Sequence, residues 1–267
     1  MINRKGKKMF SPRDFQVIDV HCHPFEDAEN SIDCYGVTRS MEDFDNEMRS
    51  LGIDFYVGCV IRHGNADFAR VQELNRKALR LRDRYPAYIP GIHLHGAYPQ
   101  ESCQELHDML SEGVRWIGEV LPYMFGPYDA PSGMVIWKEA EKLGIPVNFH
   151  YGEKDVVKNL IAQCPDLKII LAHPGDFFEE YGARARFQMV AEHPNLYMDI
   201  SGSGLFRWGM LRYAVDLCGA DHILFGTDMP VCSAGMNLYG TLSEHLTKEE
   251  FVQIFSGNFK RLTGLEL

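Results

Sequence analysis

The order of apolar segments along the chain constrains the fold more than any other feature of the sequence. Eight short apolar segments have the length and composition of β-strands, and they cover residues 16–21, 54–61, 88–93, 114–120, 145–150, 167–173, 196–200 and 222–227. Segments with helical periodicity lie between them, over residues 66–85, 101–110, 133–143, 154–164, 183–193 and 211–218. Such alternation predicts a parallel sheet with right-handed crossovers. Eight units in 267 residues favour a closed (β/α)₈ TIM barrel over an open doubly wound α/β sheet.

The chain is expected to form a single domain. Apolar residues make up 45% of it and charged residues 24%, as in soluble globular proteins with a sizeable core. We expect the barrel to span residues 16–267, after an N-terminal tail over residues 1–15. The basic run from Asn3 to Lys8 is interpreted as a solvated part of that tail, because chain termini are commonly poorly ordered.

Charge and cysteine content narrow the classes of partner. The net charge of −10 argues against a nucleic-acid partner, which a protein binds chiefly with a basic surface. No apolar segment approaches the length of a membrane span, so no membrane partner is expected. The seven cysteines are odd in number and scattered without a Cys-x-x-Cys pair, which favours reduced thiols and a cytoplasmic protein. The sequence does not decide whether the protein forms a homo-oligomer.

Residue types that bind metals stand at the carboxyl ends of the predicted strands. In a barrel all these ends open onto one face, where active sites form. Strand side chains alternate, so the first two histidines point to the same side and Cys22 points to the other. The candidate metal ligands are His21, His23, Glu119, His150, His173 and Asp228.

Imidazole and carboxylate ligands at a site with room for water suit Zn²⁺ first, and Mn²⁺ or another divalent ion next. One or two ions are compatible with this set. Such a site lowers the pKa of a bound water towards neutrality, which makes hydroxide available for hydrolysis. The competing interpretation is a set of buried polar residues that each require a hydrogen-bond partner.

Six sequence segments resemble the amidohydrolase superfamily, and together they span nearly the whole chain. They are residues 18–24 (IDVHCHP), 117–120 (IGEV), 171–175 (LAHPG), 195–202 (NLYMDISG), 224–230 (LFGTDMP) and 254–262 (IFSGNFKRL). The chain is most similar to the amidohydrolase-related branch that includes aminocarboxymuconate-semialdehyde decarboxylase-like proteins.

The resemblance implies roles for the candidate ligands. In members with one metal ion, the first two histidines, His150 and Asp228 bind it, Asp228 also accepts the proton of the attacking water, and His173 polarises the substrate or acts as an acid. In members with two ions, His150 and His173 both bind metal and strand four supplies a bridging group. Glu119 aligns with that position, as in the metal-dependent deoxyribonuclease branch. Two roles of Glu119 stay open: it either bridges two metal ions or orients a histidine ligand.

Several other polar residues have two interpretations. His93 and His95 either line the pocket or are a core and loop pair. Residues that follow strands two and seven either grip a substrate carboxylate or form surface ion pairs: Arg62, His63 and Arg207. Asp19 and Asp199 are expected to hold a ligand or the backbone. The acidic, irregular segment 26–48 is either a lid over the site or a plain insertion.

The leading functional hypothesis is metal-dependent hydrolysis of an amide, ester or lactone in a small-molecule substrate, with Asp228 as the base and His173 stabilising charge that develops on oxygen. Non-oxidative decarboxylation of a small carboxylic acid is the alternative, and it requires a cationic clamp for the acid. A catalytically silent metal-binding protein on the same barrel is the third hypothesis.

Overall fold

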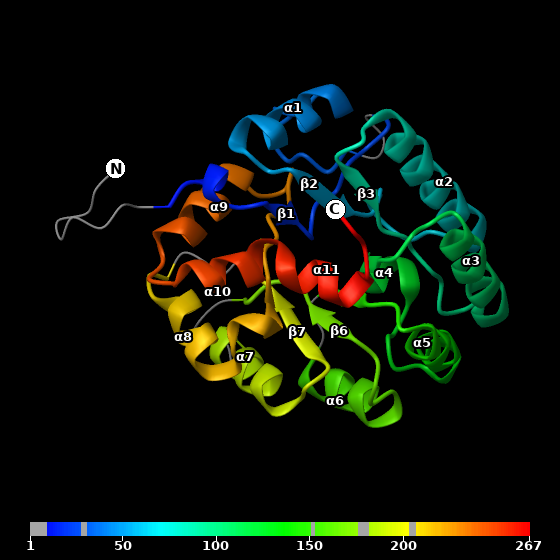
Figure 1. Cartoon of the computed structure of the whole chain (residues 1–267). Coiled ribbons are helices and arrows are strands. Elements are labelled where there is room, and N and C mark those ends of the chain that lie inside the picture. Colours follow the sequence, from blue (N-terminus) through cyan, green and yellow to red (C-terminus); the bar gives the residue numbers. More distant parts are fainter. Residues whose placement is uncertain (1–9, 28–30, 151–152, 176–181, 203–206) are drawn as a thin grey trace.

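Strands and helices alternate through the computed structural model, which describes residues 10–27, 31–150, 153–175, 182–202 and 207–267 (Figure 1). The strands in this part of the chain are β1 (Ile18–Asp19), β2 (Phe55–Gly58), β3 (Tyr88–Pro90), β4 (Ile117–Val120), β5 (Val147–Phe149), β6 (Ile169–Leu171), β7 (Leu196–Asp199) and β8 (Ile223–Leu224). The α-helices are α1 (Met41–Leu51), α2 (Phe68–Arg84), α3 (Pro99–Ser111), α4 (Pro122–Phe125), α5 (Pro131–Leu143), α6 (Lys154–Gln163), α7 (Ala183–Glu192), α8 (Met210–Cys218), α9 (Ala234–Ser243), α10 (Lys248–Val252) and α11 (Asn258–Thr263). Short 3₁₀ turns cover Pro12–Asp14 and Ala220–His222, and a π-helical turn, η4 (Gln253–Gly257), joins α10 to α11.

All strand pairs are parallel, and they form two regular arcs, β1-β2-β3 and β4-β5-β6-β7-β8. Two isolated parallel bridges join the arcs, one between Ile92 and Ile117 and one between Cys22 and Met229. Backbone hydrogen bonds support the second junction, because the Asp228 amide donates to the His21 carbonyl at 2.7 Å. β1 and β8 are only two residues long, and this junction contains one isolated bridge rather than a continuous ladder.

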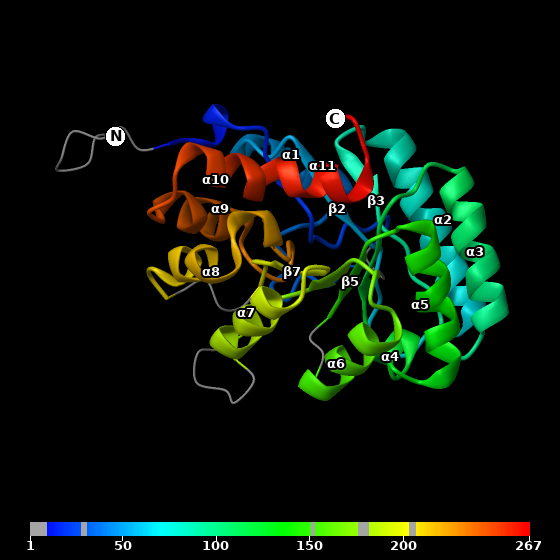
Figure 2. The same cartoon turned by 60° about the horizontal axis from the view of Figure 1, so that its bottom comes forward.

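Apolar side chains fill both sides of the strand layer. A large core cluster lies between the strands and the surrounding helices, which Figure 2 shows on the outside. A smaller cluster joins side chains of both arcs to two residues of α11: Ile18, Val20, Val57, Trp116, Ile170, Tyr197, Leu224, Phe259 and Leu262. Residues from opposite arcs touch there, as in the packed interior of a TIM barrel, and α11 lies across the strands in Figure 1.

The predicted helices are present with ends within two residues of the expected ones, but the acidic segment 26–48 is not irregular throughout. Its second half starts α1, where Ser40 accepts a hydrogen bond from the Asp43 amide and Gly52 ends the helix with a φ of 88°. Met41, Phe44 and Met48 are buried on one face of this helix. The expectation of an irregular segment is therefore wrong from Met41 onward, because burial of this apolar face outweighs the acidic composition.

The N-terminal segment is packed from the first described residue. The Phe10 and Phe15 rings lie 5.3 Å apart, and both contact the Phe251 ring, at 5.6 and 5.5 Å. Residues 10–15 of the expected tail thus pack against α10, while the basic run lies outside the described residues.

The seven cysteines are free thiols, and Cys22, Cys59 and Cys164 are buried. As expected, Cys22 points away from the histidines beside it, into the large core cluster, and its thiol donates to the Val57 carbonyl. Across the described ranges, no helix has both the length and the apolar character needed to cross a bilayer.

Candidate metal centre

The barrel brings all six predicted metal ligands together. Three overlapping groups each place their ligand atoms within 4.8 Å of one another: the two strand-one histidines with Glu119, His21 with His173 and Asp199, and Glu119 with His150 and His173. Asp228 joins the first group, because its Oδ1 lies 3.2 Å from His23 Nε2 and 3.7 Å from His21 Nε2. The expected convergence at the carboxyl ends of β1, β4, β5, β6 and β8 is present.

The carboxylate of Glu119 lies between two pairs of imidazoles. Its Oε2 is 3.6 Å from His21 Nε2 and 3.4 Å from His23 Nε2. Its Oε1 is 3.3 Å from His173 Nε2 and is hydrogen-bonded to His150 Nδ1. Each oxygen therefore faces a different histidine pair, which fits both a bridging carboxylate and one that orients histidine ligands.

Other residues fix the orientation of these histidines. His21 Nδ1 donates to Asp199 Oδ2 at 3.0 Å, and His173 Nδ1 donates to the Ser201 carbonyl at 3.3 Å. In both rings the Nε2 is then the nitrogen that faces Glu119. A neutral imidazole in this tautomer presents a lone pair to a metal ion.

The site passes a test of fit for a divalent ion. His21 Nε2 is fully buried, and among the described residues it has no hydrogen-bond partner. It faces the oxygens of Glu119 and Asp228 at 3.6 and 3.7 Å, and buried polar atoms are rarely left without a partner. Nitrogen and carboxylate ligands around one point form a donor set for Zn²⁺ or a similar ion.

Electrostatics keep the Glu119 carboxylate ionised. Burial alone would raise the pKa of Glu119, but the His21 charge and the hydrogen bonds from His150 and His173 lower it well below its usual value. Burial alone would lower the pKa of His21, yet the Asp199 and Glu119 carboxylates raise it well above its usual value. The metal-free site therefore attracts positive charge, either as protons or as a cation.

Backbone strain is concentrated at two of the ligands. His173 and Asp228 both have a φ of 63°, a left-handed conformation that is uncommon for residues other than glycine. Such outliers persist where the surrounding structure enforces them, and they cluster at functional sites.

Sequence reasoning did not identify four residues that build the site. Asn148 donates to Asp199 Oδ2 at 2.6 Å, and the buried Arg186 donates to the His173 carbonyl at 2.6 Å. The Ser201 hydroxyl contacts both Asp199 and the His173 ring. Gly202 is needed because a Cβ there would lie 2.4 Å from His173 Nδ1. Only the Ser-Gly pair after β7 offered a signal, through its place in one of the family-like segments.

Asp19 supports the junction between β1 and β8. It accepts hydrogen bonds from the His21 amide and the Thr227 amide, both at 3.0 Å, and from the Thr227 hydroxyl at 2.5 Å. The expectation that Asp19 and Asp199 hold ligands or the backbone is thus confirmed.

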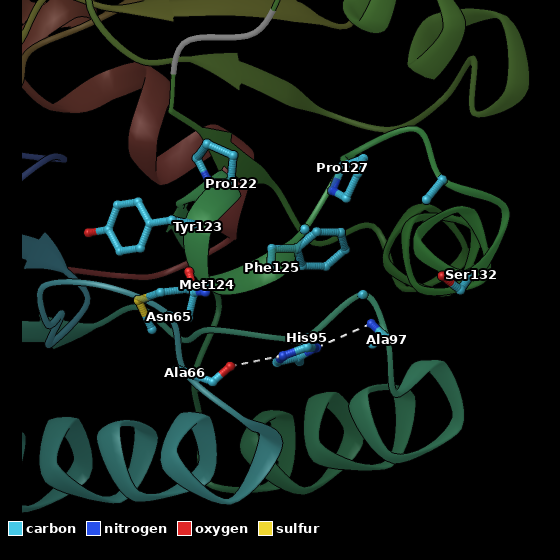
Figure 3. Close-up of a pocket in the computed structure, with 13 residues that line it drawn as sticks. Asn65, Ala66, His95, Ala97, Pro122, Tyr123, Met124, Phe125, Pro127 and Ser132 are labelled. Atoms are coloured by element: carbon cyan, nitrogen blue, oxygen red, sulfur yellow. Dashed lines mark hydrogen bonds between the residues drawn. The ribbon is translucent and has the colours of Figure 1, made fainter.

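The second His-x-His motif places one histidine in the core and the other in a loop, and contact of either with substrate stays a prediction. His93 is buried and its Nε2 contacts the Val60 carbonyl, and burial next to His23 lowers the pKa of His93 to about 4. His95 Nε2 donates to the Ala66 carbonyl and its Nδ1 accepts from the Ala97 amide, as Figure 3 shows. His95 also lines a cavity of about 420 Å³ beside α4, but both its ring nitrogens are engaged by backbone.

Arg62, one of the candidate carboxylate clamps, has local partners. Arg62 Nε donates to the His63 carbonyl, and the Arg62 carbonyl accepts the Tyr123 hydroxyl. Arg207 and Trp208 line a separate cavity of about 150 Å³ between α7 and α8, and none of the six predicted ligands lines it. A role for these residues in binding a substrate acid stays a prediction.

Ionised Asp199 is expected to stabilise the metal-free protein above about pH 4. Burial alone would raise its pKa, but His21 and Ser201 lower it from 3.8 to about 2. A depressed carboxyl pKa contributes stability above the unfolded value, and this is lost as pH falls towards the folded value. Urea unfolding should show wild type more stable than Asp199→Asn by on the order of 2 kcal/mol at pH 5, with the difference shrinking towards pH 2. A difference that does not change with pH would contradict this origin.

Comparisons with known proteins were made on the sequence and on the fold. The model of a family described as Amidohydrolase matches residues 18–265. No curated protein sequence matches the chain. Among solved structures, the chain is similar to 2,6-dihydroxybenzoate decarboxylase from Rhizobium, with a TM-score of 0.69, 18% identity, and coverage of 94% of this chain and 99% of that one.

Two further structures are similar over nearly their whole length. A dihydroxybenzoic acid decarboxylase from Polaromonas sp. JS666, solved with bound manganese, has a TM-score of 0.68, 18% identity, and coverage of 94% of this chain and 97% of that one. A protein from Pseudomonas putida, described as a candidate 2-pyrone-4,6-dicarboxylic acid hydrolase, has a TM-score of 0.69, 16% identity, and coverage of 95% and 99%. At these identities the likeness establishes the barrel fold.

Proposed function

This chain belongs to the amidohydrolase family and is a metal-dependent enzyme of that superfamily, and from this premise we propose that it hydrolyses an amide, ester or lactone in a small-molecule substrate. The observation that carries the proposal is the position of Glu119, with one oxygen towards each histidine pair. A carboxylate so placed suits a site for two cations, and paired ions are a common device for activating water.

The proposed ligands divide into two sets around Glu119. His21, His23 and Asp228 would hold one ion, and His150 and His173 would hold the second, with Glu119 shared. Ions bound there would lower the pKa of water and polarise a carbonyl oxygen. Zn²⁺ suits these donors first, and Mn²⁺ is the next choice.

The chain's own side chains supply the remaining chemistry. Asp228 Oδ1 is the carboxylate oxygen nearest the His23 ring and would accept the proton of the nucleophilic water. Asp199 holds His21 and the Ser201 carbonyl holds His173, so neither ring needs to reorient when substrate binds. Fixed dipoles of this kind stabilise developing charge without reorganisation.

Decarboxylation of a small acid is the alternative reaction, since two of the three similar structures described above are decarboxylases. That reaction needs a cationic group for the substrate carboxylate. The Arg62 Nε donates within its own loop, and Arg207 lines a different cavity, so a clamp formed by either residue at the metal centre stays a prediction of this alternative.

The test is a substrate panel with the metal supplied. A p-nitrophenyl ester, a γ-lactone, an anilide and 2,6-dihydroxybenzoate are incubated with wild type, Glu119→Gln and Glu101→Gln, each with Zn²⁺ or Mn²⁺. Glu101 is an exposed carboxylate in the first turn of α3, so its variant controls for the loss of one charge. Hydrolysis by wild type and Glu101→Gln, lost in Glu119→Gln, is expected. Release of CO₂ without hydrolysis of any other substrate would identify the protein as a decarboxylase. No activity with any metal or substrate would favour a metal-binding protein without catalytic function.

A further inference from the structure

The imidazole of His23 contains a buried nitrogen, Nδ1, that has no hydrogen-bond partner among the described residues. Its other nitrogen, Nε2, lies 3.4 Å from Glu119 Oε2 and 3.2 Å from Asp228 Oδ1, so Nε2 is the nitrogen available to a cation. The neutral ring then carries its hydrogen on Nδ1, and a buried donor without an acceptor costs free energy. The Nδ1 atoms of His21 and His173 each have an acceptor. An acceptor for the His23 hydrogen is therefore expected nearby.

His93 is a buried imidazole beyond the carboxyl end of β3 that the proposed reaction does not use. Its Nε2 donates to the Val60 carbonyl at 3.2 Å, so in the neutral ring Nδ1 carries the lone pair and can only accept. No donor in the described part of the chain contacts this Nδ1. After burial, the neighbouring charge of His23 is the largest cause that lowers the pKa of His93, to about 4. The two rings are therefore neighbours, one with a donor to place and one with an acceptor.

Strand geometry turns the His93 ring into the barrel, towards the metal centre. Ile89 packs against the interior cluster, and a Cβ on Gly91 would lie 3.1 Å from Cδ1 of the interior Trp116. His93 follows at the same two-residue spacing, so its side chain points to the same side, nearer the strand ends. The residue before His23 donates its amide to β2, and the His93 ring donates to the segment just after β2. The two histidines thus approach the end of β2 from its two neighbouring strands.

A buried polar network holds the backbone of His93 in place. The Asn75 side chain in α2 accepts from the His93 amide at 2.8 Å and donates to the His93 carbonyl at 3.0 Å. It also donates to Glu105 in α3 at 2.9 Å, and Gln72 donates to the other Glu105 oxygen at 2.9 Å. Asn75 and Glu105 are both buried, and such groups cost free energy unless they are hydrogen-bonded. The network therefore gives His93 a fixed position at the strand ends.

We propose that His93 is a positioning residue of the metal centre, whose Nδ1 accepts the Nδ1 hydrogen of His23 through one water molecule and so keeps His23 Nε2 aimed at the cation. A water is included because no direct hydrogen bond joins the two rings in the described structure, and buried waters commonly bridge such groups. The inference rests on the metal dependence of the proposed function. Removal of a partner that orients a histidine ligand commonly weakens metal binding by about 10- to 100-fold.

Three substitutions of His93 separate its two ring nitrogens. An Asn amide lies where Nδ1 lies and a Gln amide where Nε2 lies, whereas Phe removes both groups. The Kd for Zn²⁺, measured by competition with a chromophoric chelator, is expected to rise roughly tenfold or more in His93→Gln and His93→Phe, and to stay within roughly threefold of wild type in His93→Asn. His222→Phe is the matched control and should leave the Kd unchanged, because His222 contacts the Leu196 carbonyl at 2.8 Å at the start of β8, away from the ligands. Circular dichroism verifies that each variant is folded.

The order of the variants decides between two roles of His93. Affinity kept in His93→Gln and lost in His93→Asn would overturn the proposal, because His93 would then only anchor the segment after β2 through Nε2. Equal Kd values in all three His93 variants would also overturn it. The comparison of Asn with Gln holds even if His93→Phe does not fold.

Nitrogen-15 NMR of the histidine rings in Zn²⁺-loaded wild type tests the contact without a substitution. A hydrogen on Nδ1 of His23 and on Nε2 of His93 is expected, with exchange of the His23 hydrogen faster in His93→Gln. A hydrogen on Nδ1 of His93, or an exchange rate unchanged in His93→Gln, would overturn the proposal. Neither readout uses turnover, so failure here leaves the proposed hydrolase intact. A protein that binds no Zn²⁺ would overturn both this inference and the proposed function.

Discussion

Asp228→Asn is expected to lower turnover on the order of 10³-fold while the protein stays folded, because the substitution removes the proposed base. The Asp228 oxygen lies 3.2 Å from His23 Nε2, and an Asn side chain keeps the shape but accepts protons poorly. The fold should tolerate the change, because the φ of 63° at this position is a conformation that Asn adopts as readily as Asp.

The measurement is kcat together with metal content, so that loss of the base is separated from loss of an ion. Asp155→Asn serves as the control, since Asp155 is an exposed carboxylate in the first turn of α6. Turnover of Asp228→Asn within tenfold of wild type, at equal metal content, would remove Asp228 from the role of base.

Gly202→Ala is the second substitution with a large expected effect. Its Cβ would lie 2.4 Å from His173 Nδ1 and 3.2 Å from Asp228 Oδ2, so the His173 ring must move. The φ of 62° at Gly202 adds backbone strain for any other residue. Displacement of a positioned group by about 1 Å can cost about 10²-fold in rate, so we expect a loss of that order in kcat and a lower melting temperature.

Gly240→Ala in α9 is the matched control. A Cβ there has no atom within 4 Å and the residue is helical, so alanine should raise stability slightly and leave kcat unchanged. Equal kcat values for Gly202→Ala and Gly240→Ala would show that the close approach of Gly202 to His173 does not affect catalysis.

The metal centre was largely predictable because barrel geometry converts strand order into proximity. Once strands one, four, five, six and eight were placed in one parallel ring, residues at their carboxyl ends had to meet, and no pairwise contact needed to be known. Which histidine pair each Glu119 oxygen faces was not predictable, since this depends on side-chain orientation rather than on strand position. The sequence therefore left the bridging and orienting roles of Glu119 open.

Residues that act through other residues leave no pattern in the sequence that identifies them. Arg186 lies inside α7, a helix expected from its pattern, and only the structure shows its side chain reaching the His173 carbonyl. Helix α1 differs, because two features of its sequence disagree. Ser40 as a cap, apolar residues at 41, 44, 48 and 51, and Gly52 indicate a helix, whereas the acidic composition of segment 26–48 indicates an irregular segment.

The central claim is that Glu119 is shared between two cations, and metal stoichiometry tests it most directly. Metal content per chain is measured by inductively coupled plasma mass spectrometry on protein loaded with Zn²⁺ and freed of excess metal, for wild type, His21→Ala and Glu119→Ala. The account predicts about two ions per chain in wild type and one or none in both variants. One ion in wild type, lost in His21→Ala and kept in Glu119→Ala, would contradict it and make Glu119 a residue that only orients the histidines.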